Sequence, residues 1–466
     1  MLPLITVVFT EGLDLSKKEY EKMVSNVLKV QATSIINAQG QPVVLRGFNL
    51  GGWMNMENFI TGYPANEEVQ RQAIRDVLGE ETYVYFFDRF LEYFFGRDDA
   101  QYIASLGLNL LRLPINYRHF ESDMEPFVIK EEGFKRLDRV INLCAEQQIY
   151  TIIDLHALPG YQNQDWHSDN PTHKAFFWQH KHFQDRVVHL WEAIATRYKD
   201  HPWVAGYNPI NEPADPSEAQ IEPFYRRLYQ AIRAIDPDHI LFLEGNRYSL
   251  DFHMFKEPLP NVVYTTHDYA LSLSDKSALE QAFLQKTSYM RETGTPIWVG
   301  EFGSAQAEPK RFPVLRDQLE IYDRYQASWS IWTFKGIGLL GVVSVSPDSR
   351  WIQRIQPFLE KKARLGVDAA TQDTLIRQII QPLEETFARE FPNYNPFPFG
   401  ATWMIRRLVR YILLAEPLLE EYAALFKGMS KSEIDEMMQS FQFKQCVQHA
   451  ELANILGKPP RDSSRG

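Results

Sequence analysis

The sequence predicts an α/β fold, a parallel (β/α)8 TIM barrel with additions at both ends of the chain. Eight short apolar runs recur between residues 43 and 334, and longer stretches with helical spacing separate them. The runs are too apolar for strands with a solvated face, which indicates a parallel sheet covered on both sides. A doubly wound sheet is the alternative, but no glycine-rich phosphate loop follows the first run. We therefore expect the closed barrel.

Residues 1–40 are expected to form a helix and a hairpin that pack on the barrel. Ser16-Lys-Lys-Glu19 is a capping box, and apolar residues follow it at helical spacing, so a helix is predicted over 15–29. Residues 34–46 are predicted to be a hairpin that turns at Ala38–Gly40.

The barrel itself is predicted to span residues 41–365. Its strands are expected at 43–50, 109–115, 150–156, 204–210, 239–244, 262–267, 296–301 and 328–334, and helices between them at 134–147, 180–198, 218–235 and 311–325. The first strand is followed by a long loop, about residues 53–97, which is rich in aromatic residues at helical spacing. We expect most of them to pack a small subdomain over the barrel rim.

An extra helical region is predicted over residues 366–456, and a disordered tail over 457–466, which lacks core-forming residues. The basic residues Arg406, Arg407 and Arg410 are expected on a solvated helix face. A role of this amphipathic region in binding a membrane or a partner is the alternative.

Charge and composition exclude several classes of function. The 466-residue chain has a formal net charge of -11, so a nucleic-acid or anionic-membrane partner is not expected. No run of about 20 apolar residues is present, so no transmembrane segment is predicted. The first ten residues lack a basic region and a long apolar run, which predicts no signal peptide and a cytoplasmic protein. The two cysteines, Cys144 and Cys446, exclude a disulfide framework, and whether they pair stays open.

Polar or aromatic side chains end six of the eight predicted strands. In a TIM barrel these ends converge on one face, where active sites lie. The residues are Arg112, His156, Asn211, Glu212, His267, Tyr269, Glu301 and Trp332.

Two of these residues, Glu212 and Glu301, have the character that glycoside cleavage requires: one protonated acid and one ionised carboxylate on opposite sides of the anomeric carbon. Strands four and seven face each other across a barrel mouth, which favours the spacing of about 5 Å typical of retaining enzymes. Glu212 is predicted to be the acid/base, with its pKa raised by burial and by Glu301. Glu301 is predicted to be the nucleophile, kept ionised by Arg112 and Tyr269.

The remaining residues suit substrate binding. Asn211 is expected to hold the sugar 2-hydroxyl, and Trp332 to form a platform under the ring. His156 and His267 are expected to donate hydrogen bonds to hydroxyls or to the glutamates. No metal site is predicted, because no His-x-His or similar cluster lies on an early strand. No cofactor is expected.

Arg112, His156, Asn211-Glu212-Pro213, His267-Asp-Tyr269, Glu301 and Trp332 together resemble the pattern of glycoside hydrolase family five, a group of cellulase-like retaining β-glycosidases. The resemblance covers about residues 40–335. It implies that the first glutamate is the acid/base and the second the nucleophile, in agreement with the roles argued above.

Within that family, Arg46-Gly-Phe-Asn-Leu-Gly-Gly-Trp53 followed by Glu57 is similar to fungal exo-β-1,3-glucanases. This resemblance implies that Glu57 binds the terminal sugar. The chain departs from that group in its third loop, where Trp166-His-Ser-Asp169 stands in place of a usual asparagine, in lacking a secretion signal, and in its C-terminal helices.

We therefore expect an exo-acting retaining β-glycosidase whose partner is a β-linked glycoside or oligosaccharide, such as a β-glucoside. The long first loop, Trp166 and Phe176-Phe177-Trp178 are expected to wall off its pocket. An endo-acting glucanase or mannanase, or a glycolipid-cleaving relative, is the alternative, and a catalytically silent carbohydrate-binding barrel is a different class. Sugar identity, linkage and oligomeric state are not predicted.

Overall fold

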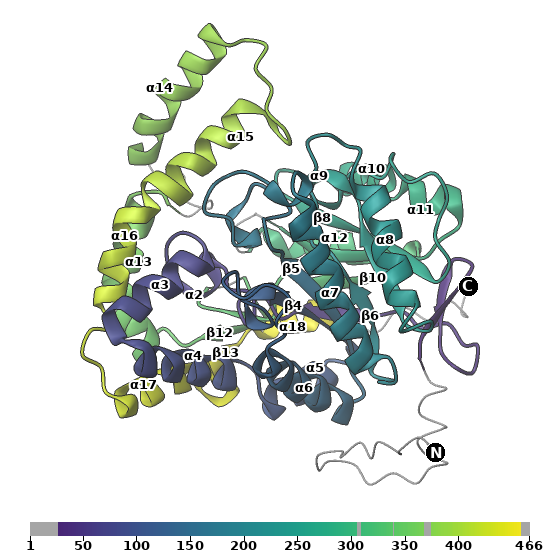
Figure 1. Cartoon of the computed structure of the whole chain (residues 1–466), viewed down its shortest axis with the longest axis horizontal. Helices are drawn as coiled ribbons and strands as arrows, with labels where there is room; N and C mark the ends of the chain where they lie inside the picture. The colour runs from purple at the N-terminus through teal and green to yellow at the C-terminus, as the bar shows by residue number, and fades with distance from the viewer. Residues whose placement is uncertain (1–26, 305–308, 339, 368–373, 458–466) are drawn as a thin grey trace.

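The computed structural model of the chain describes residues 27–304, 309–338, 340–367 and 374–457. Eight parallel strands close into a barrel in the order β10-β3-β4-β5-β6-β7-β8-β9, which confirms the predicted (β/α)8 fold (Figure 1). Each strand overlaps a predicted apolar run. The strands are β3 (Arg46–Asn49), β4 (Leu110–Asn116), β5 (Tyr150–Ala157), β6 (Val204–Asn208), β7 (Ile240–Glu244), β8 (Val262–Ala270), β9 (Ile297–Ser304) and β10 (Ser328–Ile331).

Amphipathic helices cover the outside of the barrel. In α8, Phe224, Leu228 and Ile232 recur every fourth position and are buried against the sheet. The covering helices are α6 (Glu131–Glu146), α7 (Lys181–Tyr198), α8 (Ile221–Arg233), α10 (Lys276–Lys286), α11 (Ser288–Thr293) and α12 (Arg311–Arg324). Helix α13 (Arg350–Arg364) instead packs on the C-terminal region, where Trp351 stacks on Phe426. Short helices in the loops are η1 (Tyr117–His119), η2 (Trp166–Ser168), η3 (Phe176–Trp178) and α9 (Asn246–Ser249).

A hairpin closes the amino-terminal end of the barrel. Its strands β1 (Lys29–Gln31) and β2 (Ser34–Ile36) pair antiparallel, and the predicted turn over 38–40 follows, after which the Val43 N–H donates to the backbone oxygen of Ile35 at 2.8 Å. Pro42 makes only an isolated bridge to Ile36, because proline has no N–H to extend a ladder. Ile35 packs with inward-facing strand residues such as Trp298. Nearly all of the helix predicted over 15–29 lies outside the described residues.

The long first connection forms α2 (Asn58–Thr61), α3 (Glu67–Leu78), α4 (Glu80–Phe94) and α5 (Arg97–Ser105). Its aromatic residues do more than cover the rim. Phe86 meets Phe426 with ring centroids 5.1 Å apart, and Phe90 meets Phe441 at 5.0 Å. The first connection and the C-terminal region therefore share one core.

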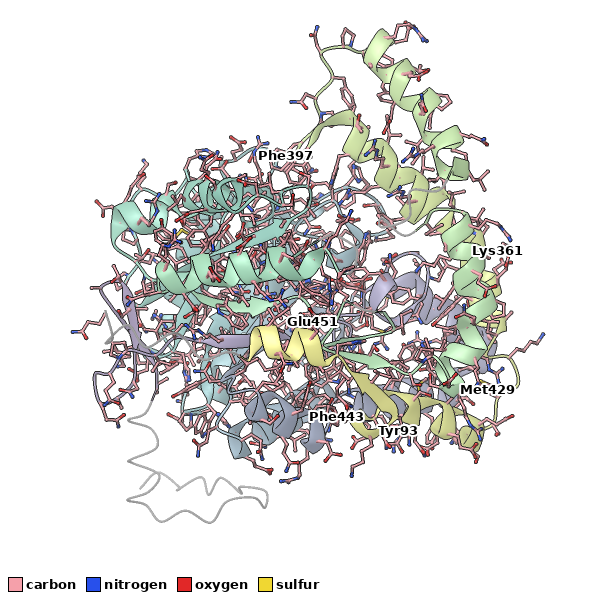
Figure 2. The ribbon with its side chains drawn as sticks, turned by 180° about the vertical axis from the view of Figure 1, so that it is seen from behind. Tyr93, Lys361, Phe397, Met429, Phe443 and Glu451 are labelled. Atoms are coloured by element: carbon pink, nitrogen blue, oxygen red, sulfur yellow. The ribbon has the colours of Figure 1, made fainter. Side chains whose placement is uncertain are left out.

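The C-terminal region consists of α14 (Thr374–Glu390), α15 (Gly400–Arg407), the π-helical turn η4 (Leu408–Leu413), α16 (Ala415–Ala424), α17 (Lys431–Met438), η5 (Gln439–Phe441), η6 (Phe443–Gln445), β13 (Cys446–Gln448) and α18 (Ala450–Leu456). The expectation of an all-helical region was incomplete. β13 pairs antiparallel with β12 (Val343–Val345), which also pairs with β11 (Lys335–Gly336). Seen from behind, α18, marked by Glu451, crosses the back of the molecule (Figure 2).

Lys335 in β11 joins these distant segments. It is fully buried, and its Nζ donates to the backbone oxygens of Phe94 at 2.7 Å and Phe441 at 2.9 Å. Asp99 completes the site with an ion pair at 2.6 Å. A buried ammonium is tolerated only with such a full set of partners.

Residues 374–413, which we name the C-terminal arm, project away from the barrel as a pair of helices (Figure 1). Ile376 and Ile380 of α14 pack on Ile405 and Val409. Both cysteines are buried and free. Among the helices of the described ranges, none has the length and apolar character needed to span a bilayer.

Candidate active site

The nine side chains predicted from the sequence lie in the barrel strands or in the loops that follow them. All are buried except Tyr269, which is half-buried. Arg112 lies in β4, His156 in β5, His267 and Tyr269 in β8, and Glu301 in β9, while Glu57 follows β3, Asn211 and Glu212 follow β6, and Trp332 follows β10.

Both carboxylate oxygens of Glu301 are held by side chains of barrel strands. The Tyr269 hydroxyl donates to Oε2 at 2.7 Å, and Arg112 Nη1 donates to Oε1 at 2.7 Å. Burial opposes ionisation of Glu301, but the charges of His267 and Arg112 outweigh it and lower its pKa. The side chain is therefore an ionised carboxylate at neutral pH.

Arg112 is fully buried and organises the floor of the site. Its guanidinium also donates to Asn211 Oδ1 at 2.7 Å and to Asn208 Oδ1 at 2.8 and 3.0 Å. Carboxylates of Asp154 and Glu244 lie 3.2 Å away. The buried guanidinium thus balances several acidic groups, which is the condition for keeping it in a dry interior.

Glu212 occupies a strained backbone position. Its φ is +45°, in the left-handed region that non-glycine residues rarely adopt, at a cost of about 1–3 kcal/mol. The backbone N–H of Glu212 donates to Oε2 of Glu244 at 2.7 Å, and Glu244 is itself fully buried. This charge-assisted hydrogen bond holds the turn that directs Glu212 into the site.

Two imidazoles hold the side chain of Glu212. His267 Nδ1 lies 2.7 Å from Oε1, and His167 Nε2 lies 2.9 Å from Oε2. Burial favours the protonated form of Glu212, but the contacts with His167 and His267 outweigh it and lower its pKa. The expectation of a raised pKa was wrong, because His167 was not expected beside Glu212 and the combined effect of His167 and His267 exceeds that of burial.

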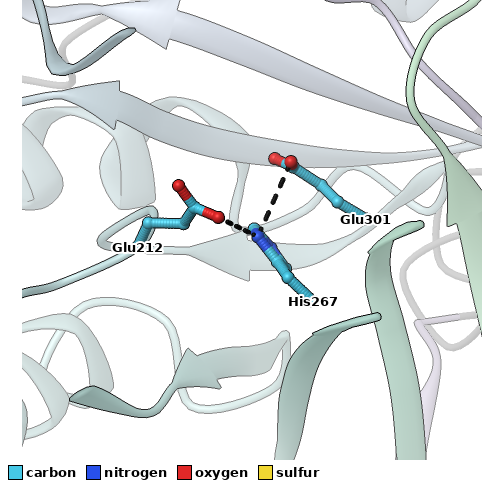
Figure 3. Close-up of side chains that lie close together, drawn as sticks. All are labelled: Glu212, His267 and Glu301. Carbon is cyan, nitrogen blue, oxygen red and sulfur yellow. Dashed lines mark hydrogen bonds and ion pairs between the residues drawn. The ribbon is translucent and has the colours of Figure 1, made fainter. Parts of the chain in front are cut away.

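Glu212 and Glu301 approach each other on either side of His267 (Figure 3). One oxygen of each carboxylate and a ring nitrogen of His267 all lie within 4.8 Å of one another. His267 Nδ1 is also 3.6 Å from Oε2 of Glu301. Within the described ranges, this is the one set of three such side chains that could share an ion. The three side chains contact one another directly, and His267 Nδ1 is hydrogen-bonded to Glu212.

The other predicted residues line one side of this pair. His156 stacks on Trp332, with ring centroids 5.2 Å apart and an interplanar angle of 15°. Burial disfavours the charge on His156, but Asp154, 2.7 Å from Nδ1, outweighs it and raises the pKa of His156 to about 10. Glu57 lies 3.6 Å from His156 Nε2, and burial raises its pKa. Charged and aromatic groups thus face the same small space, as polyhydroxylated ligands require.

Sequence reasoning missed Glu244 and His167. Glu244 ends the fifth predicted strand, so the rule that found the other strand-end residues could have found it. His167 lies in the third loop, where only its position was noted. No sequence pattern predicts that this loop folds back onto Glu212.

The wall around the site also differs from the expected one. Trp166 meets Phe59 of the first loop and Tyr411 of the C-terminal arm, each with centroids 5.5 Å apart. Phe177 and Trp178 instead pack against Phe224 of α8 in the core. The expectation that Phe177 and Trp178 wall the pocket was wrong, because both side chains are buried against α8 instead.

One of the basic residues expected on a solvated helix face contacts the loop that carries His167. Arg406 pairs with Glu384 and stays exposed, whereas Arg407 Nε forms a 2.6 Å ion pair with buried Asp165. The Arg407 guanidinium also lies 3.9 Å from the ring centroid of Trp403. The arm is thereby tied to the catalytic face of the barrel.

The chain is similar to several known proteins. The family model for cellulase, glycosyl hydrolase family 5, matches residues 92–337. A beta-xylosidase of Phanerodontia chrysosporium is 45% identical, over 92% of this chain and 97% of that protein. A probable glucan 1,3-beta-glucosidase A of Aspergillus clavatus is 28% identical, over 65% of this chain and 74% of that protein. The crystal structure of an endogalactoceramidase has the same fold, with a TM-score of 0.52, 19% identity, and coverage of 66% of this chain and 74% of that one.

Proposed function

The chain belongs to glycoside hydrolase family 5, and we propose that it is an exo-acting β-glycosidase in which Glu212 is the acid/base and Glu301 the nucleophile. The observation that carries this assignment is the close approach of the two carboxylates in unlike surroundings. Oxygens of the two groups lie within 4.8 Å of each other, which suits the narrow separation of retaining enzymes, roughly 5 Å between carboxyl groups.

The surroundings support the division of roles. In the first step, Glu301 attacks the anomeric carbon while a proton passes from Glu212 to the departing glycosidic oxygen, so the C–O bond breaks and a glycosyl ester forms. In the second step, Glu212 takes a proton from water, whose oxygen displaces Glu301 and gives the β-anomer. Arg112 and Tyr269 keep Glu301 ionised for the attack.

Burial supports exo action. Glu57, Glu212 and Glu301 are 4%, 8% and 4% exposed, which suits a site entered from one end better than an open cleft. Glu57 and the stacked pair His156 and Trp332 would hold the terminal sugar at the closed end. Asn211, held by Arg112, would bind its 2-hydroxyl.

For the sugar we propose a terminal β-xylosyl residue, with β-glucosyl as the second candidate. The proposal rests on the name of the relative that matches nearly the whole chain at 45% identity, a beta-xylosidase. The 28% identical relative named probable glucan 1,3-beta-glucosidase A supports the second candidate.

The mechanism is tested with azide rescue. In Glu301→Ala, azide should attack the substrate directly and give the α-glycosyl azide. In Glu212→Ala, azide should open the glycosyl-enzyme and give the β-glycosyl azide. If the anomers are exchanged between the variants, the roles are reversed. If wild-type enzyme first releases the α-sugar, as seen by proton NMR, the reaction inverts and the mechanism is wrong.

Substrate class is tested with matched aryl β-D-xyloside and β-D-glucoside, followed by a linear β-linked oligosaccharide. We expect higher kcat/KM on the xyloside and release of single sugars only. Preference for the glucoside would reassign the sugar. Internal fragments early in the reaction would show endo action.

A further inference from the structure

His167 stands where it can exchange a proton with Glu212. Its Nε2 lies 2.9 Å from Oε2 of Glu212, while His267 engages the other oxygen. His167 is also within 3.1 Å of the side-chain nitrogen of Asn163. Asn163 is oriented by its other bonds, since Nδ2 donates to the backbone oxygen of Glu212 and Oδ1 accepts from the backbone of Asp165.

These two neighbours make opposite demands on Nε2 of His167. The Glu212 carboxylate favours a proton on Nε2, whereas the Asn163 N–H favours a lone pair there. An ion pair of imidazolium with carboxylate and a neutral pair of imidazole with carboxylic acid are therefore both accommodated. The proton that Glu212 must deliver can therefore reside either on Nε2 of His167 or on Oε2 of Glu212.

The loop that presents His167 is held by the C-terminal arm. Asp165 caps η2 by accepting from the Trp166 backbone N–H, and its other oxygen pairs with Arg407 of α15 at 2.6 Å. That same oxygen, Oδ2, lies 3.9 Å from Nδ1 of His167. Arg407 thus neutralises an acidic group that faces the far side of the imidazole.

Other charged or titratable groups also surround His167. Burial opposes its charge, but the contact with Glu212 outweighs this and raises the pKa of His167. The facing groups are Glu212 after β6, Asp165 on its own loop, Glu57 after β3, the ring of His156 in β5 at 5.9 Å, and the ring of Tyr248 after β7 at 5.8 Å.

Resting on the proposed function, we propose that His167 is a positioning residue that stores the catalytic proton for Glu212, and that the C-terminal arm sets how tightly this proton is held through Arg407 and Asp165. In glycosylation the proton moves from His167 Nε2 to Glu212 Oε2 and on to the leaving oxygen. In deglycosylation the proton removed from water returns by the same path. The arm thereby acts on the chemistry through the loop that carries His167.

The first experiment compares His167→Asn and His167→Gln with the wild type on two aryl glycosides. With a phenyl leaving group, which needs protonation, kcat/KM should fall about 10²-fold. With a 2,4-dinitrophenyl leaving group, it should change less than about threefold, because that group departs without a proton. The basic limb of the pH profile should move to lower pH by about one unit or more, since one of the two imidazoles beside Glu212 is then lost and only His267 remains. Equal losses on both substrates, or an unmoved basic limb, would overturn the proposal.

The second experiment changes charge at a distance from the substrate. Asp165→Asn keeps the cap on η2 but removes the negative charge facing His167, so the basic limb should move to lower pH. Arg407→Gln leaves Asp165 uncompensated, so the limb should move to higher pH. Each shift is expected to be about half a unit to one unit. Shifts in the same direction would contradict the proposal even if the His167 variants failed to fold.

The matched control is Arg406→Gln, an equal charge change on the same helix. Arg406 pairs with Glu384 within the arm and its side chain is 52% exposed. Its pH profile should match the wild type, and a shift equal to that of Arg407→Gln would overturn the assigned route. Glu212→Gln distinguishes a failure of the proposed function from a failure of the role proposed for His167. If it retains activity on the phenyl glycoside, the proposed function fails, whereas a loss there with unaltered His167 variants rejects this inference alone.

Discussion

The two carboxylates of the site differ in how much of their support comes from outside the barrel strands, since His267 of β8 holds one oxygen of Glu212 but a loop residue holds the other. Glu301 lies on β9, and both of its oxygens are bound by side chains of other barrel strands, Arg112 on β4 and Tyr269 on β8. Glu212 follows β6 in a left-handed turn, and one of its oxygens is bound by His167, whose loop is held in turn by the C-terminal arm.

This difference assigns separate tasks to separate parts of the chain. A nucleophile needs a fixed charge, and the barrel strands supply it through buried ion pairs. An acid/base must gain and lose a proton in every cycle, so its partners must accept two states. Loops and the added arm can vary these partners without disturbing the barrel.

Among the substitutions that test this comparison, the largest loss of activity should follow from changing the carboxylate that the barrel strands hold, Glu301. Glu301→Gln should lower kcat by about 10⁴-fold or more on every substrate, because the glycosyl-enzyme cannot form. Steady-state rates with phenyl and 2,4-dinitrophenyl glycosides measure it. A loss confined to the phenyl substrate would mean that Glu301, not Glu212, supplies the proton, and the comparison would be reversed.

The next largest loss of activity should follow from changing Glu212, the carboxylate whose second oxygen is held by the loop residue His167. Glu212→Gln should lower kcat/KM by about 10²–10⁴-fold on phenyl glycosides and far less on 2,4-dinitrophenyl glycosides. A burst of dinitrophenol should appear, since the second step still lacks its base. An equal loss on both substrates without a burst would remove the distinction between the two carboxylates.

A smaller effect is expected at Glu244, which connects the two sides. Glu244→Gln weakens the hydrogen bond that holds the Glu212 backbone at φ +45°. A charge-assisted hydrogen bond contributes about 1.5–3 kcal/mol, so kcat/KM should fall roughly 10- to 100-fold. Phenyl glycosides should be affected more than dinitrophenyl glycosides. Uniform loss on both would place the effect of Glu244 on Arg112 and Glu301 instead.

The smallest effect should follow from Tyr269→Phe, which removes one donor from Glu301 and leaves Arg112 in place. We expect about a tenfold loss of kcat/KM. The acidic limb of the pH profile should move to higher pH, because losing the donor raises the pKa of Glu301 and the carboxylate protonates sooner. A shift of the basic limb alone would show that Tyr269 serves the acid/base.

The sequence predicts the barrel side of this comparison well. Apolar runs locate the strands, and the residue at the end of each run is directed to the mouth by the fold itself. Arg112, Tyr269 and Glu301 follow from that rule without any knowledge of contacts.

The loop side could not be predicted in the same way. Whether His167 reaches Glu212 depends on the conformation of the third loop, which Asp165 and Arg407 fix across 242 positions of sequence. Arg407 shares the helical spacing of its neighbour Arg406, and nothing local distinguishes the buried arginine from the exposed one. The direction of the pKa shift of Glu212 was mispredicted for the same reason, because it depends on which side chains the loops place beside this carboxylate.

The buried Lys335 depends on a partner that is synthesised much later than the lysine itself. One of its acceptors, the backbone oxygen of Phe441, is 106 positions further along the sequence. At a synthesis rate of about 5–20 residues per second, roughly 5–20 s pass between the two residues. During that interval, Phe86 and Phe90 also await their partners Phe426 and Phe441. The nascent barrel therefore leaves these apolar side chains and the Lys335 ammonium without their C-terminal partners until that segment emerges from the ribosome.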